Sequence, residues 1–528
     1  MHMPHATPQD IPREACGVLG VFSPGEDVAR MAYFGLIQLQ HRGEESAGIA
    51  AVACPFVGPR ACPAAFVRRS GASVPREVRE QREGASSERE RGSGKIKLHR
   101  DMGLVMQVFD EDTLALLRGD AAIGHNRYST MGASLIANAQ PLLVRVPGFG
   151  ANLALGHNGS LVNAPELRKR LGAAGIHLES TTDSEIIAKL IALEADTAPT
   201  FEDAIRAAAC ACQGSYSLTM LTDRFAPGAG DACLMALRDP WGVRPLCIGE
   251  LDAGRYVIAS ETCALPVLGA RFLREVERGE LVVVGRDGLR SVQLLEQQRM
   301  ALCVFEFIYF ARPDSVIAGV LLHQARRRMG HELAAEHPAQ ADMVIPVPET
   351  GWPAAIGYAE ASGIPLGQGL IRNRYIGRTF IQPDQRMREQ GAQLKYTSLN
   401  QEVAGKRLVV IDDTIIRGTT KAKTVGLLRE AGATEVHVRI TAPPYRYPCF
   451  YGVDTSARGT LIAARASCID DIRRIIGADS LGYLSAERLV RAVGLPRESL
   501  CMACLDGEYP IAVSDELMAQ KTALEQPQ

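Results

Sequence analysis

The sequence predicts two successive folding units, a layered α/β or α+β unit in the first half and an α/β unit with a parallel sheet in the second. In the first half, short apolar runs broken by glycine alternate with helical stretches such as residues 184–195 and 201–211. In the second half, an apolar run, a loop, a helix and a further apolar run follow one another over residues 407–440, which is the order of a parallel βαβ unit. The length of 528 residues has room for about two to four domains.

Composition and charge narrow the class of protein. With 46% hydrophobic and 22% charged residues, the chain has the composition of a soluble globular protein. Its net charge of −2 provides no basic field for a nucleic acid, and it contains no apolar run long enough to span a membrane. The first 15 residues lack the apolar core of a secretory signal. We therefore expect a cytoplasmic protein without nucleic-acid or membrane partners, whose 13 cysteines are reduced and available for catalysis or metal binding.

The apolar run GVLGVF at residues 17–22 predicts a buried strand, and Cys16 stands directly before it. A cysteine at such a place is usually packed in the core. The loose, proline-containing tail before it could instead be removed, which would leave Cys16 as the first residue. Residues 55–94 are rich in charged residues, glycine and serine, so they predict a disordered surface insertion between two strands or, as an alternative, a partner-binding loop.

Three further motifs of the first half complement Cys16. Arg127 in GHNRYSTMG can hold a carboxylate in a bidentate fork, or it can form a structural ion pair. Asn158 and Gly159 in GHNGSLVN offer the two donors of an oxyanion hole, or a plain turn. Asp183 in TTDSEII can bind an ammonium group or cap a helix. Together they supply a nucleophile, an oxyanion hole, a carboxylate binder and an amine binder, a set that suits glutamine.

The second half carries a phosphate-binding pattern at the end of a buried strand. In RLVVIDDTIIRGTT, apolar residues precede Asp412 and Asp413, and the loop ends at a helix. Two carboxylates at a strand end require a cation or sugar hydroxyls. Gly418 lets the backbone approach a ligand, and Thr419 and Thr420 join the loop N–H groups in a phosphate cradle. The pattern is not a Walker loop, and it suits a ribose phosphate better than a simple acidic turn.

With these motifs, the chain closely resembles the glutamine phosphoribosylpyrophosphate (PRPP) amidotransferases, or amidophosphoribosyltransferases, which catalyse the first committed step of purine synthesis. The resemblance covers nearly the whole chain apart from the tail and the charged insertion. It rests on the stretches CGVLGVF, LQHRGEESAGIA, GHNRYSTMG, GHNGSLVN, TTDSEI, DPWGVRPL, EFIYFARPDS, NRYIGRTFIQP, VVIDDTIIRGTT and PCFYGVDTS. One departure is Glu44, where the family usually has glutamine, and we expect little effect on the chemistry.

The resemblance implies a domain organisation. Residues 1–15 would be a propeptide, and residues 16–285 a glutaminase domain with the sandwich fold of N-terminal-nucleophile hydrolases. Residues 286–470 would form a type I phosphoribosyltransferase domain with a parallel sheet, and residues 471–528 a C-terminal helical segment with cluster ligands. Removal of the propeptide would free the α-amine of Cys16, whose pKa of about 8 suits a proton acceptor.

The resemblance also implies the site residues. Cys16 would be the nucleophile, Asn158 and Gly159 the oxyanion hole, and Arg127 and Asp183 the binders of glutamine. PRPP would be bound by the strand-end loop and by one arginine of a basic segment: Asp412, Asp413, Thr414, Arg417, Gly418, Thr419, Thr420 and Arg378. Mg²⁺ would be held by Thr350, Asp412 and Asp413. The basic segment around Arg378 would be a mobile lid that excludes water from PRPP, unless it is only a solvated basic face.

Four cysteines stand in the sequence contexts that hold a [4Fe–4S] cluster in one branch of the family: Cys303, Cys449, Cys501 and Cys504. By chemistry alone, four thiolates fit Zn²⁺ as well as an iron–sulfur cluster, and the C-x-x-C pair by itself could be redox-active. The resemblance favours the cluster. It further implies one Mg²⁺ and one cluster per subunit, inhibition by purine nucleotides, and a homotetramer.

Two other functions compete with this one. The first half could serve a different amidotransferase, such as one that makes asparagine or glucosamine phosphate, but neither reaction uses PRPP. The chain could also be a purine-responsive regulator that binds PRPP without catalysis, which would leave Cys16, Arg127 and Asn158 without a purpose. Release of pyrophosphate from PRPP in the presence of glutamine distinguishes the three.

Overall fold

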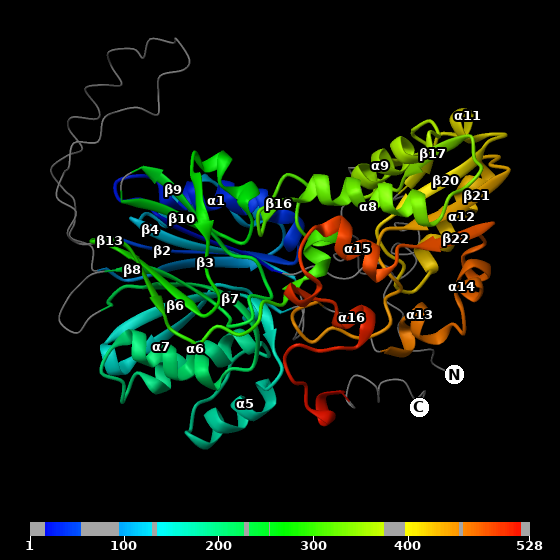
Figure 1. The fold of residues 1–528 in the computed structure, drawn as a ribbon. Helices are drawn as coiled ribbons and strands as arrows, with labels where there is room; N and C mark the ends of the chain where they lie inside the picture. Colours follow the sequence, from blue (N-terminus) through cyan, green and yellow to red (C-terminus); the bar gives the residue numbers. More distant parts are fainter. Residues whose placement is uncertain are drawn as a thin grey trace, which may run out of the picture.

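The structure is a computed structural model that describes residues 16–53, 94–128, 135–225, 232–252, 254–373, 396–453 and 458–518. The chain folds into two lobes that follow one another along the sequence (Figure 1). The first lobe, drawn from blue to green, holds two stacked sheets, and the second, drawn in yellow and orange, holds a parallel sheet. The expected propeptide lies outside the described residues, and so does the expected insertion apart from its last residue.

The first lobe is built on two antiparallel sheets. One has seven strands in the order β11-β9-β10-β1-β4-β2-β3, and the other has six in the order β13-β12-β8-β7-β6-β5. The strands of the first sheet are β1 (Gly17–Phe22), β2 (Ser46–Val52), β3 (Lys97–Met102), β4 (Ala121–Arg127), β9 (Cys247–Asp252), β10 (Arg255–Ala259) and β11 (Arg271–Glu275). The strands of the second sheet are β5 (Leu142–Val146), β6 (Ala151–Leu161), β7 (Gly214–Thr222), β8 (Cys233–Arg238), β12 (Glu280–Gly285) and β13 (Gly288–Gln293).

Strand β1 is buried on both faces, which explains its uninterrupted apolar run. Val18 and Phe22 face the second sheet and join the core between the two sheets. Leu19 and Val21 face the opposite way and pack in the core under helix α1 (Val28–Gln38). Since successive side chains of a strand point to opposite faces, a strand with two covered faces needs apolar residues at nearly every position.

Helices cover the outer faces of both sheets. α6 (Asp183–Glu194) and α7 (Phe201–Ala211) pack on the second sheet near α5 (Ala164–Ala173), while α1 covers the first sheet (Figure 1). The two helices predicted over residues 184–195 and 201–211 are therefore confirmed. The lobe has four layers, helix, sheet, sheet and helix, which is the sandwich that the family resemblance implied.

The second lobe contains a parallel sheet in the order β17-β20-β21-β22, as predicted for this half. Its strands are β17 (Met343–Pro346), β20 (Arg407–Asp412), β21 (Glu435–Ile440) and β22 (Ser480–Tyr483). The helices of this lobe are α8 (Leu322–Glu336), α9 (Trp352–Ser362), α11 (Asn400–Val403), α12 (Thr419–Glu430), α13 (Ile462–Arg465), α14 (Ile469–Ile476) and α15 (Ala486–Val493).

Two strands carry these sheets past the residues where we expected the domains to end. β13 is the edge strand of the second sheet and lies beyond residue 285. β22 lies beyond residue 470, in a segment that we expected to be helical. Both are hard to detect from sequence, because β13 is largely exposed and β22 has only 4 residues.

The C-terminal segment, red in Figure 1, returns to the junction between the lobes. There, the short parallel strands β14 (Leu302–Cys303) and β23 (Leu500–Cys501) pair, with Cys303 opposite Cys501. A buried π-helix, η6 (Glu306–Phe310), follows β14. The remaining short α-helices and strands are α3 (Val105–Val108), α4 (Glu111–Leu116), α16 (Ala503–Asp506), β15 (Val316–Ile317), β16 (Val320–Leu321), β18 (Leu370–Arg372) and β19 (Tyr396–Ser398).

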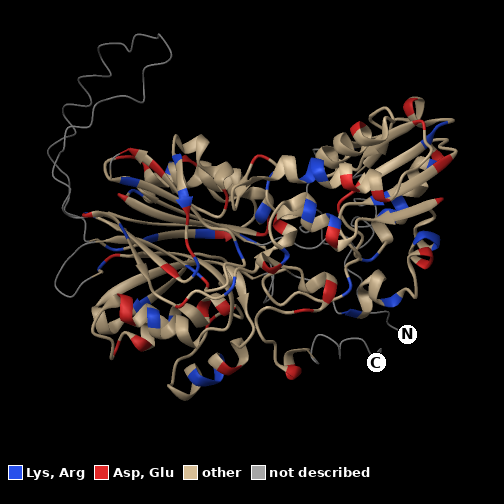
Figure 2. Ribbon diagram, viewed as in Figure 1, with Lys and Arg blue, Asp and Glu red and all other residues tan. Residues whose placement is uncertain are grey.

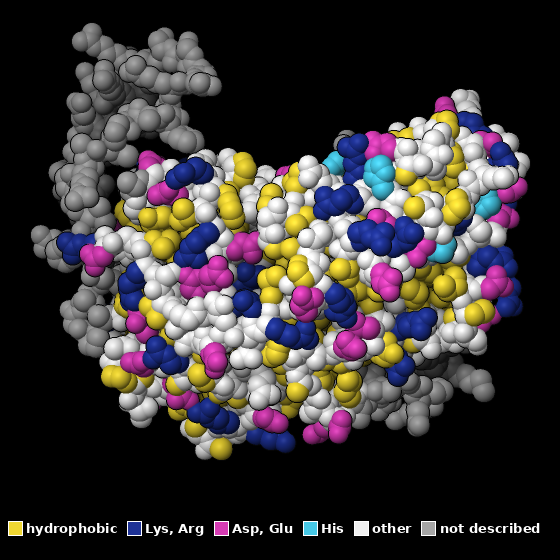
Figure 3. Space-filling view, viewed as in Figure 1, with side chains coloured by type: hydrophobic (Ala, Val, Ile, Leu, Met, Phe, Trp, Pro, Cys, Tyr) yellow, Lys and Arg dark blue, Asp and Glu magenta, His cyan; other side chains and the backbone are white. Residues whose placement is uncertain are grey.

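Charges are distributed evenly over the visible surface. Figure 2 shows acidic and basic residues interspersed on both lobes, and Figure 3 shows them mixed with apolar side chains on the face in view. Among the helices of the described ranges, none combines the length and the apolar character that a membrane crossing requires.

Candidate active sites

Cys16 lies at the start of β1, beside the end of β4. The strand register pairs Gly17 with Asn126, and this brings Cys16 next to Arg127 and Tyr128. The Cys16 Sγ atom lies 3.6 Å from the Tyr128 carbonyl oxygen, and the residue is buried. Burial raises the pKa of the Cys16 thiol, although the positive charge of Arg127 opposes the shift. The thiol therefore needs a proton acceptor before it can act as a nucleophile near neutral pH.

Asn158 and Gly159 lie near the end of the long strand β6, opposite β4. His125 Nε2 on β4 is 3.0 Å from the His157 carbonyl oxygen on β6. The Asn158 side chain is fully buried, and neither its amide nitrogen nor its oxygen has a hydrogen-bond partner among the described residues. Such an amide is available to a ligand. Gly159 has a φ of +151°, and a Cβ there would lie 2.1 Å from the Ser215 carbonyl oxygen, so the position accepts only glycine.

Arg127 and Asp183 both lie near this nucleophile. The Arg127 guanidinium is buried and forms an ion pair with Glu45 at 2.5 Å. Asp183 is the first residue of α6, and its carboxylate accepts a hydrogen bond of 2.9 Å from the Leu161 N–H. The charges of Arg127 and Asp183 both act on the Cys16 thiol. The structure therefore places the predicted nucleophile, carboxylate binder and amine binder in one site.

Two residues of this site were not identified from the sequence, although both lie inside the quoted motifs. Glu45 neutralises Arg127. His157 Nδ1 lies 3.6 Å from the Asp183 carboxylate. Burial alone would raise the pKa of Asp183, but His157 and the Leu161 N–H outweigh it, and the pKa of this carboxyl is lowered. Asp183 is therefore an anion at neutral pH, as binding of an ammonium group requires.

The second site lies at the carboxyl end of β20. Asp412 and Asp413 end this strand and are buried. Asp413 accepts hydrogen bonds from the hydroxyls of Thr350 at 2.6 Å and Thr414 at 2.8 Å, and burial raises the pKa of its carboxyl. Thr350, Asp412, Asp413 and Thr414 line one cavity with Thr420. The end of a parallel sheet is the usual place for a ligand in such a fold.

Lys421 is the residue of this second site that the sequence did not reveal. It lies in the first turn of α12, is 4% exposed, and forms an ion pair with Asp412. From the sequence, Lys421 is an ordinary residue of a predicted helix, because no neighbouring residue indicates that it is buried. Its ammonium group neutralises the Asp412 carboxylate, one of the two buried carboxylates at the strand end.

The loop before α12 has the geometry of a phosphate cradle. Gly418 precedes the helix with a φ of +87°, and a Cβ there would lie 2.5 Å from the Ile462 side chain. Thr419 and Thr420 form the first turn, where backbone N–H groups point out of the helix and favour an anion. Arg378 and the rest of the expected lid after Asn373 lie outside the described residues.

The oxygen-rich end of β20 suits Mg²⁺. Mg²⁺ is typically bound through one or two carboxylates together with substrate phosphates and water. Asp412 and Asp413 provide the carboxylates, and the Thr350 hydroxyl is already directed at Asp413. These residues fit the expected ion, and Lys421 would share Asp412 with it.

The four cysteines expected to hold a cluster line one cavity at the junction between the lobes. The paired strands β14 and β23 bring Cys303 and Cys501 together, while α16 carries Cys504. Burial raises the pKa of Cys303 to about 11. For Cys504, burial raises the pKa further, and the charges of Cys449, Cys303 and Cys501 each add to the rise. The four thiols are therefore close neighbours in a buried cavity.

The lining of the cysteine cavity suits thiolate ligands. Within the described part of the chain, no three His, Cys, Asp or Glu side chains are arranged to hold one metal ion. A Zn²⁺ site would need four sulfur atoms at about 2.3 Å from one centre. A [4Fe–4S] cluster likewise takes four cysteine thiolates. The cavity is otherwise lined by apolar and aromatic side chains and by Arg244, whose positive charge suits thiolate ligands.

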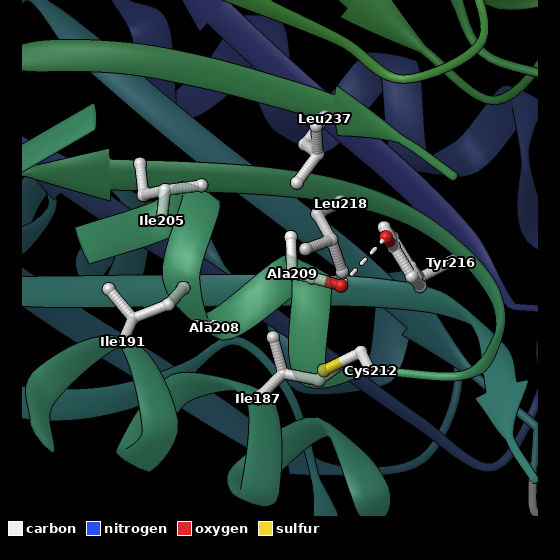
Figure 4. A pocket seen from close by; sticks show the side chains of 9 residues that line it. All are labelled: Ile187, Ile191, Ile205, Ala208, Ala209, Cys212, Tyr216, Leu218 and Leu237. Atoms are coloured by element: carbon white, nitrogen blue, oxygen red, sulfur yellow. Dashed lines mark hydrogen bonds between the residues drawn. The ribbon is translucent and has the colours of Figure 1, made fainter. Parts of the chain in front are cut away.

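A further cavity lies between α6 and α7 and the second sheet (Figure 4). It is lined by Ile187, Ile191, Ile205, Ala208, Ala209, Cys212, Tyr216, Leu218 and Leu237. The Tyr216 hydroxyl donates to the Ala209 carbonyl at 3.4 Å, and burial raises the pKa of Cys212 to about 12. With no charged group and no reactive thiol in its lining, this cavity is a gap in helix-on-sheet packing rather than a site.

Comparisons with known proteins match both a domain of the first lobe and nearly the whole chain. Residues 125–267 match the family of glutamine amidotransferase domains. The chain is 47% identical to the amidophosphoribosyltransferase of Synechococcus elongatus, with 98% of this chain and 95% of that protein aligned. It is 41% identical to the amidophosphoribosyltransferase of Methanothermobacter thermautotrophicus, with 96% of each aligned.

Solved structures agree over both lobes. The glutamine PRPP amidotransferase of B. subtilis, solved with ADP and GMP, superposes with a TM-score of 0.80 at 40% identity, and the match covers 95% of this chain and 98% of that one. A structure described as the allosteric regulatory enzyme of purine biosynthesis superposes with a TM-score of 0.81 at 40% identity, covering 96% and 99%.

Proposed function

Because the chain belongs to the amidophosphoribosyltransferase family, we propose that its two clusters of polar residues divide the reaction of that family between them. The enzyme converts PRPP, glutamine and water into 5-phosphoribosylamine, glutamate and pyrophosphate, the first committed step of purine biosynthesis. The first lobe would release ammonia from glutamine, and the second would add it to PRPP.

In the glutaminase site, the nucleophile would be the Cys16 thiol. Once Met1–Ala15 is removed, the free α-amine of Cys16 accepts the thiol proton, and the thiolate attacks the side-chain amide of glutamine. The Asn158 amide and the Gly159 N–H stabilise the tetrahedral oxyanion. Ammonia leaves, and water then hydrolyses the thioester to release glutamate. Arg127 binds the α-carboxylate of the substrate and Asp183 its α-ammonium group.

One observation carries this assignment, namely the buried Asn158 amide that has no hydrogen-bond partner among the described residues. An unpartnered buried amide costs roughly 1–3 kcal/mol. It is expected where a bound substrate or an oxyanion supplies the missing acceptor.

In the synthase site, the loop before α12 would hold the phosphate and the pyrophosphate of PRPP. Its residues would be Asp412, Asp413, Thr414, Arg417, Gly418, Thr419 and Thr420, with Arg378 from the expected lid. Thr350, Asp412 and Asp413 would hold Mg²⁺, which when bound neutralises the charge of the leaving pyrophosphate. The carboxylates orient the ribose hydroxyls, and ammonia then displaces pyrophosphate at C1 of the ribose.

We also assign a [4Fe–4S] cluster to Cys303, Cys449, Cys501 and Cys504, as a structural link between the lobes and the C-terminal segment. Support comes from the one cavity that all four cysteines line. The cluster, when bound, replaces buried thiols by an anionic group that Arg244 can compensate.

Three further assignments follow the family resemblance. The sheets extend the expected bounds of the two units: residues 16–293 rather than 16–285 would form the glutaminase unit, and the phosphoribosyltransferase unit would continue past residue 470 to include β22. Purine nucleotides would inhibit the enzyme, in keeping with the ADP and GMP bound to the B. subtilis relative. The assembly would be a homotetramer.

The test is pyrophosphate release from PRPP with glutamine, compared with release from PRPP with ammonium. For Cys16→Ala we expect loss of the glutamine-dependent reaction and survival of the ammonium-dependent one, because only the first site loses its nucleophile. Equal loss of both reactions would contradict two separate sites. Binding of PRPP without any pyrophosphate release by the unmodified chain would favour a regulator instead.

A further inference from the structure

A buried chain of ion pairs connects the two halves of the glutaminase site through the junction between the lobes. At its centre is Glu306, the first residue of the π-helix η6. Its carboxylate is fully buried and accepts hydrogen bonds from Arg42 at 2.8 and 3.0 Å and from Arg244 at 3.1 Å. Both guanidinium groups are buried as well.

On one side, this series of ion pairs ends at the nucleophile. Arg42 Nε donates a hydrogen bond of 3.2 Å to the carbonyl oxygen of Cys16. The same guanidinium is also paired with Glu261 at 2.5 Å. Burial would lower the pKa of Arg42, but Glu306 and Glu261 outweigh it, so its pKa is raised and the group stays charged.

On the other side, the series of ion pairs ends behind the proposed oxyanion hole. Arg244 donates two hydrogen bonds, of 2.9 and 3.2 Å, to the Tyr451 carbonyl oxygen. The Ser215 hydroxyl donates to the same oxygen at 2.9 Å and accepts from the Ser160 N–H at 3.3 Å. Ser160 directly follows Gly159 in the chain.

Gly452 brings this turn into direct contact with the oxyanion hole. It follows Tyr451 with a φ of +95°, and a Cβ there would lie 2.9–3.1 Å from the backbone atoms of Gly159. There is no room for a side chain between the two glycines. A displacement of the Tyr451 carbonyl would therefore also displace Gly159, whose N–H is one of the two proposed oxyanion donors.

We propose that Glu306 is a positioning residue that fixes Cys16 and Gly159 relative to one another through Arg42 and Arg244. This inference rests on the proposed function of the glutaminase site. Because one carboxylate holds both guanidinium groups, the nucleophile and the oxyanion hole share a single anchor, and that anchor belongs to the segment that leads into the second lobe. Attack on an amide depends on the relative positions of the thiolate and the N–H donors, and a misplacement of about 1 Å can lower the rate about 100-fold.

The π-helix itself is held in place from the second lobe. Arg326 on α8 donates to the Phe307 carbonyl at 2.8 Å and to the Ala311 carbonyl at 2.6 Å. A π-helix is a rare element that is frequent at functional sites. Arg326 satisfies carbonyl groups there, and so keeps Glu306 directed into the junction.

The first test uses Glu306→Gln, which keeps the shape of the side chain and removes its charge. We expect the glutamine-dependent kcat to fall by about tenfold or more, with the KM for glutamine little changed, because the variant disturbs the attack geometry and not the binders Arg127 and Asp183. The ammonium-dependent reaction should stay close to that of the unmodified enzyme, which also shows that the variant is folded.

A matched control is Glu280→Gln. Glu280 is also a buried glutamate, and its carboxylate contacts Arg274 at 2.6 Å, the Glu277 N–H and the Ser291 hydroxyl, none of which we assign to either site. The control should leave the ratio of glutamine-dependent to ammonium-dependent activity unchanged.

A second variant, Gly452→Ala, tests the other end and decides the matter if Glu306→Gln does not fold. Its methyl group must push against Gly159, so we expect the same selective loss of glutamine use. An unchanged activity ratio, or an equal fall of both reactions in the folded variant, would overturn the inference. If the unmodified enzyme itself lacks glutamine-dependent pyrophosphate release, the proposed function fails first, and this outcome is distinct.

Discussion

Among the described residues, the buried side-chain amide of Asn158 has no hydrogen-bond partner at either its nitrogen or its oxygen. Asn138, which is also fully buried, uses its nitrogen and its oxygen on Thr181 at 2.9 and 3.0 Å. Asn158 has neither bond among the described residues. Its burial therefore lowers the stability of the free protein, and we expect the bound substrate to recover that free energy.

Asn158→Leu should separate stability from activity. The substitution replaces the unpartnered amide by an apolar group with the same branching pattern, so we expect the free energy of unfolding to rise by about 1 kcal/mol. The glutamine-dependent kcat should fall by roughly 10²–10³, as on loss of an oxyanion donor. Chemical denaturation and steady-state kinetics measure the two effects.

The control for this prediction is Thr219→Val, on the neighbouring strand β7. Thr219 also has a buried side-chain oxygen without a partner among the described residues, but we place it outside the glutaminase chemistry. A gain in stability with unchanged activity is expected there. A comparable loss of activity in both variants would contradict the special role of Asn158.

Lys421 gives a second prediction at this scale. Lys421→Met leaves the buried Asp412 carboxylate without its cation, so the free energy of unfolding without Mg²⁺ should fall by about 3 kcal/mol. Added Mg²⁺ should restore part of the loss, because the ion would compensate the same carboxylate. Thermal unfolding with and without Mg²⁺ measures both.

Lys406→Met serves as the matched control, since the ion pair of Lys406 with Glu402 is exposed. Its effect should stay below about 1 kcal/mol and should not depend on Mg²⁺. A loss in Lys421→Met that Mg²⁺ does not reduce would argue against an ion at Asp412.

Among the elements, helix α12 and the loop before it decide the synthase site. The loop turns through Gly418, which is left-handed and lies against Ile462 of α13. The helix then begins at Thr419, so that its first N–H groups face the same cavity as Asp412 and Asp413. A residue with a side chain at the turn would move the cradle away from the carboxylates.

Gly418→Ala should therefore weaken PRPP binding. We expect the KM for PRPP to rise about tenfold, equivalent to roughly 1.4 kcal/mol, because a Cβ would meet the Ile462 side chain and a non-glycine residue disfavours this φ. The ammonium-dependent reaction provides the measurement, since it does not need the glutaminase site.

Gly426→Ala, in the same helix, is the control. A Cβ at Gly426 meets no atom within 4 Å, and alanine is the better helix former. The control should raise the stability by about 1 kcal/mol and leave the KM for PRPP unchanged. An equal KM in both variants would contradict the phosphate cradle at Gly418.

At the scale of the whole molecule, distant segments of the chain meet at the junction between the lobes. The cysteine cavity there is lined by Cys303 from before the parallel sheet, by Cys449 from after β21, and by Cys501 and Cys504 from near the C-terminal end. The Glu306 network lies next to it, since Arg244 lines the cavity and also binds Glu306. A bound cluster would therefore stabilise the lobe arrangement on which the glutaminase site depends.

Cys501→Ser tests the cluster. We expect loss of bound iron and acid-labile sulfide and a lower melting temperature, because one thiolate ligand is missing and the cavity remains open. Cys468→Ser is the control, since Cys468 is exposed and outside the cavity, and it should retain iron. If the unmodified enzyme, prepared without oxygen, contained no iron and were as stable as an iron-containing preparation, a structural cluster would be contradicted.

Much of the fold and of both candidate sites could be predicted from the sequence, because the informative features are local. The run GVLGVF predicted β1, and the strand-loop-helix order predicted β20 and α12. Cys16 and the pair Asp412 and Asp413 lie directly at the ends of such strands. Their neighbourhood follows from a few consecutive residues and from where strand ends must lie in a sheet.

Only the tertiary structure revealed the partners that these residues acquire over long distances. Arg42 and Glu306 are 264 positions apart, and neither stands out in its own segment. Lys421 reads as an exposed helix residue until the fold directs it at Asp412. The edge strand β13 and the short strand β22 likewise depend on the sheets that they join. These charged residues matter to the sites because they are buried, and a charge removed from water requires a partner. The packing of distant segments decides which residue that partner is.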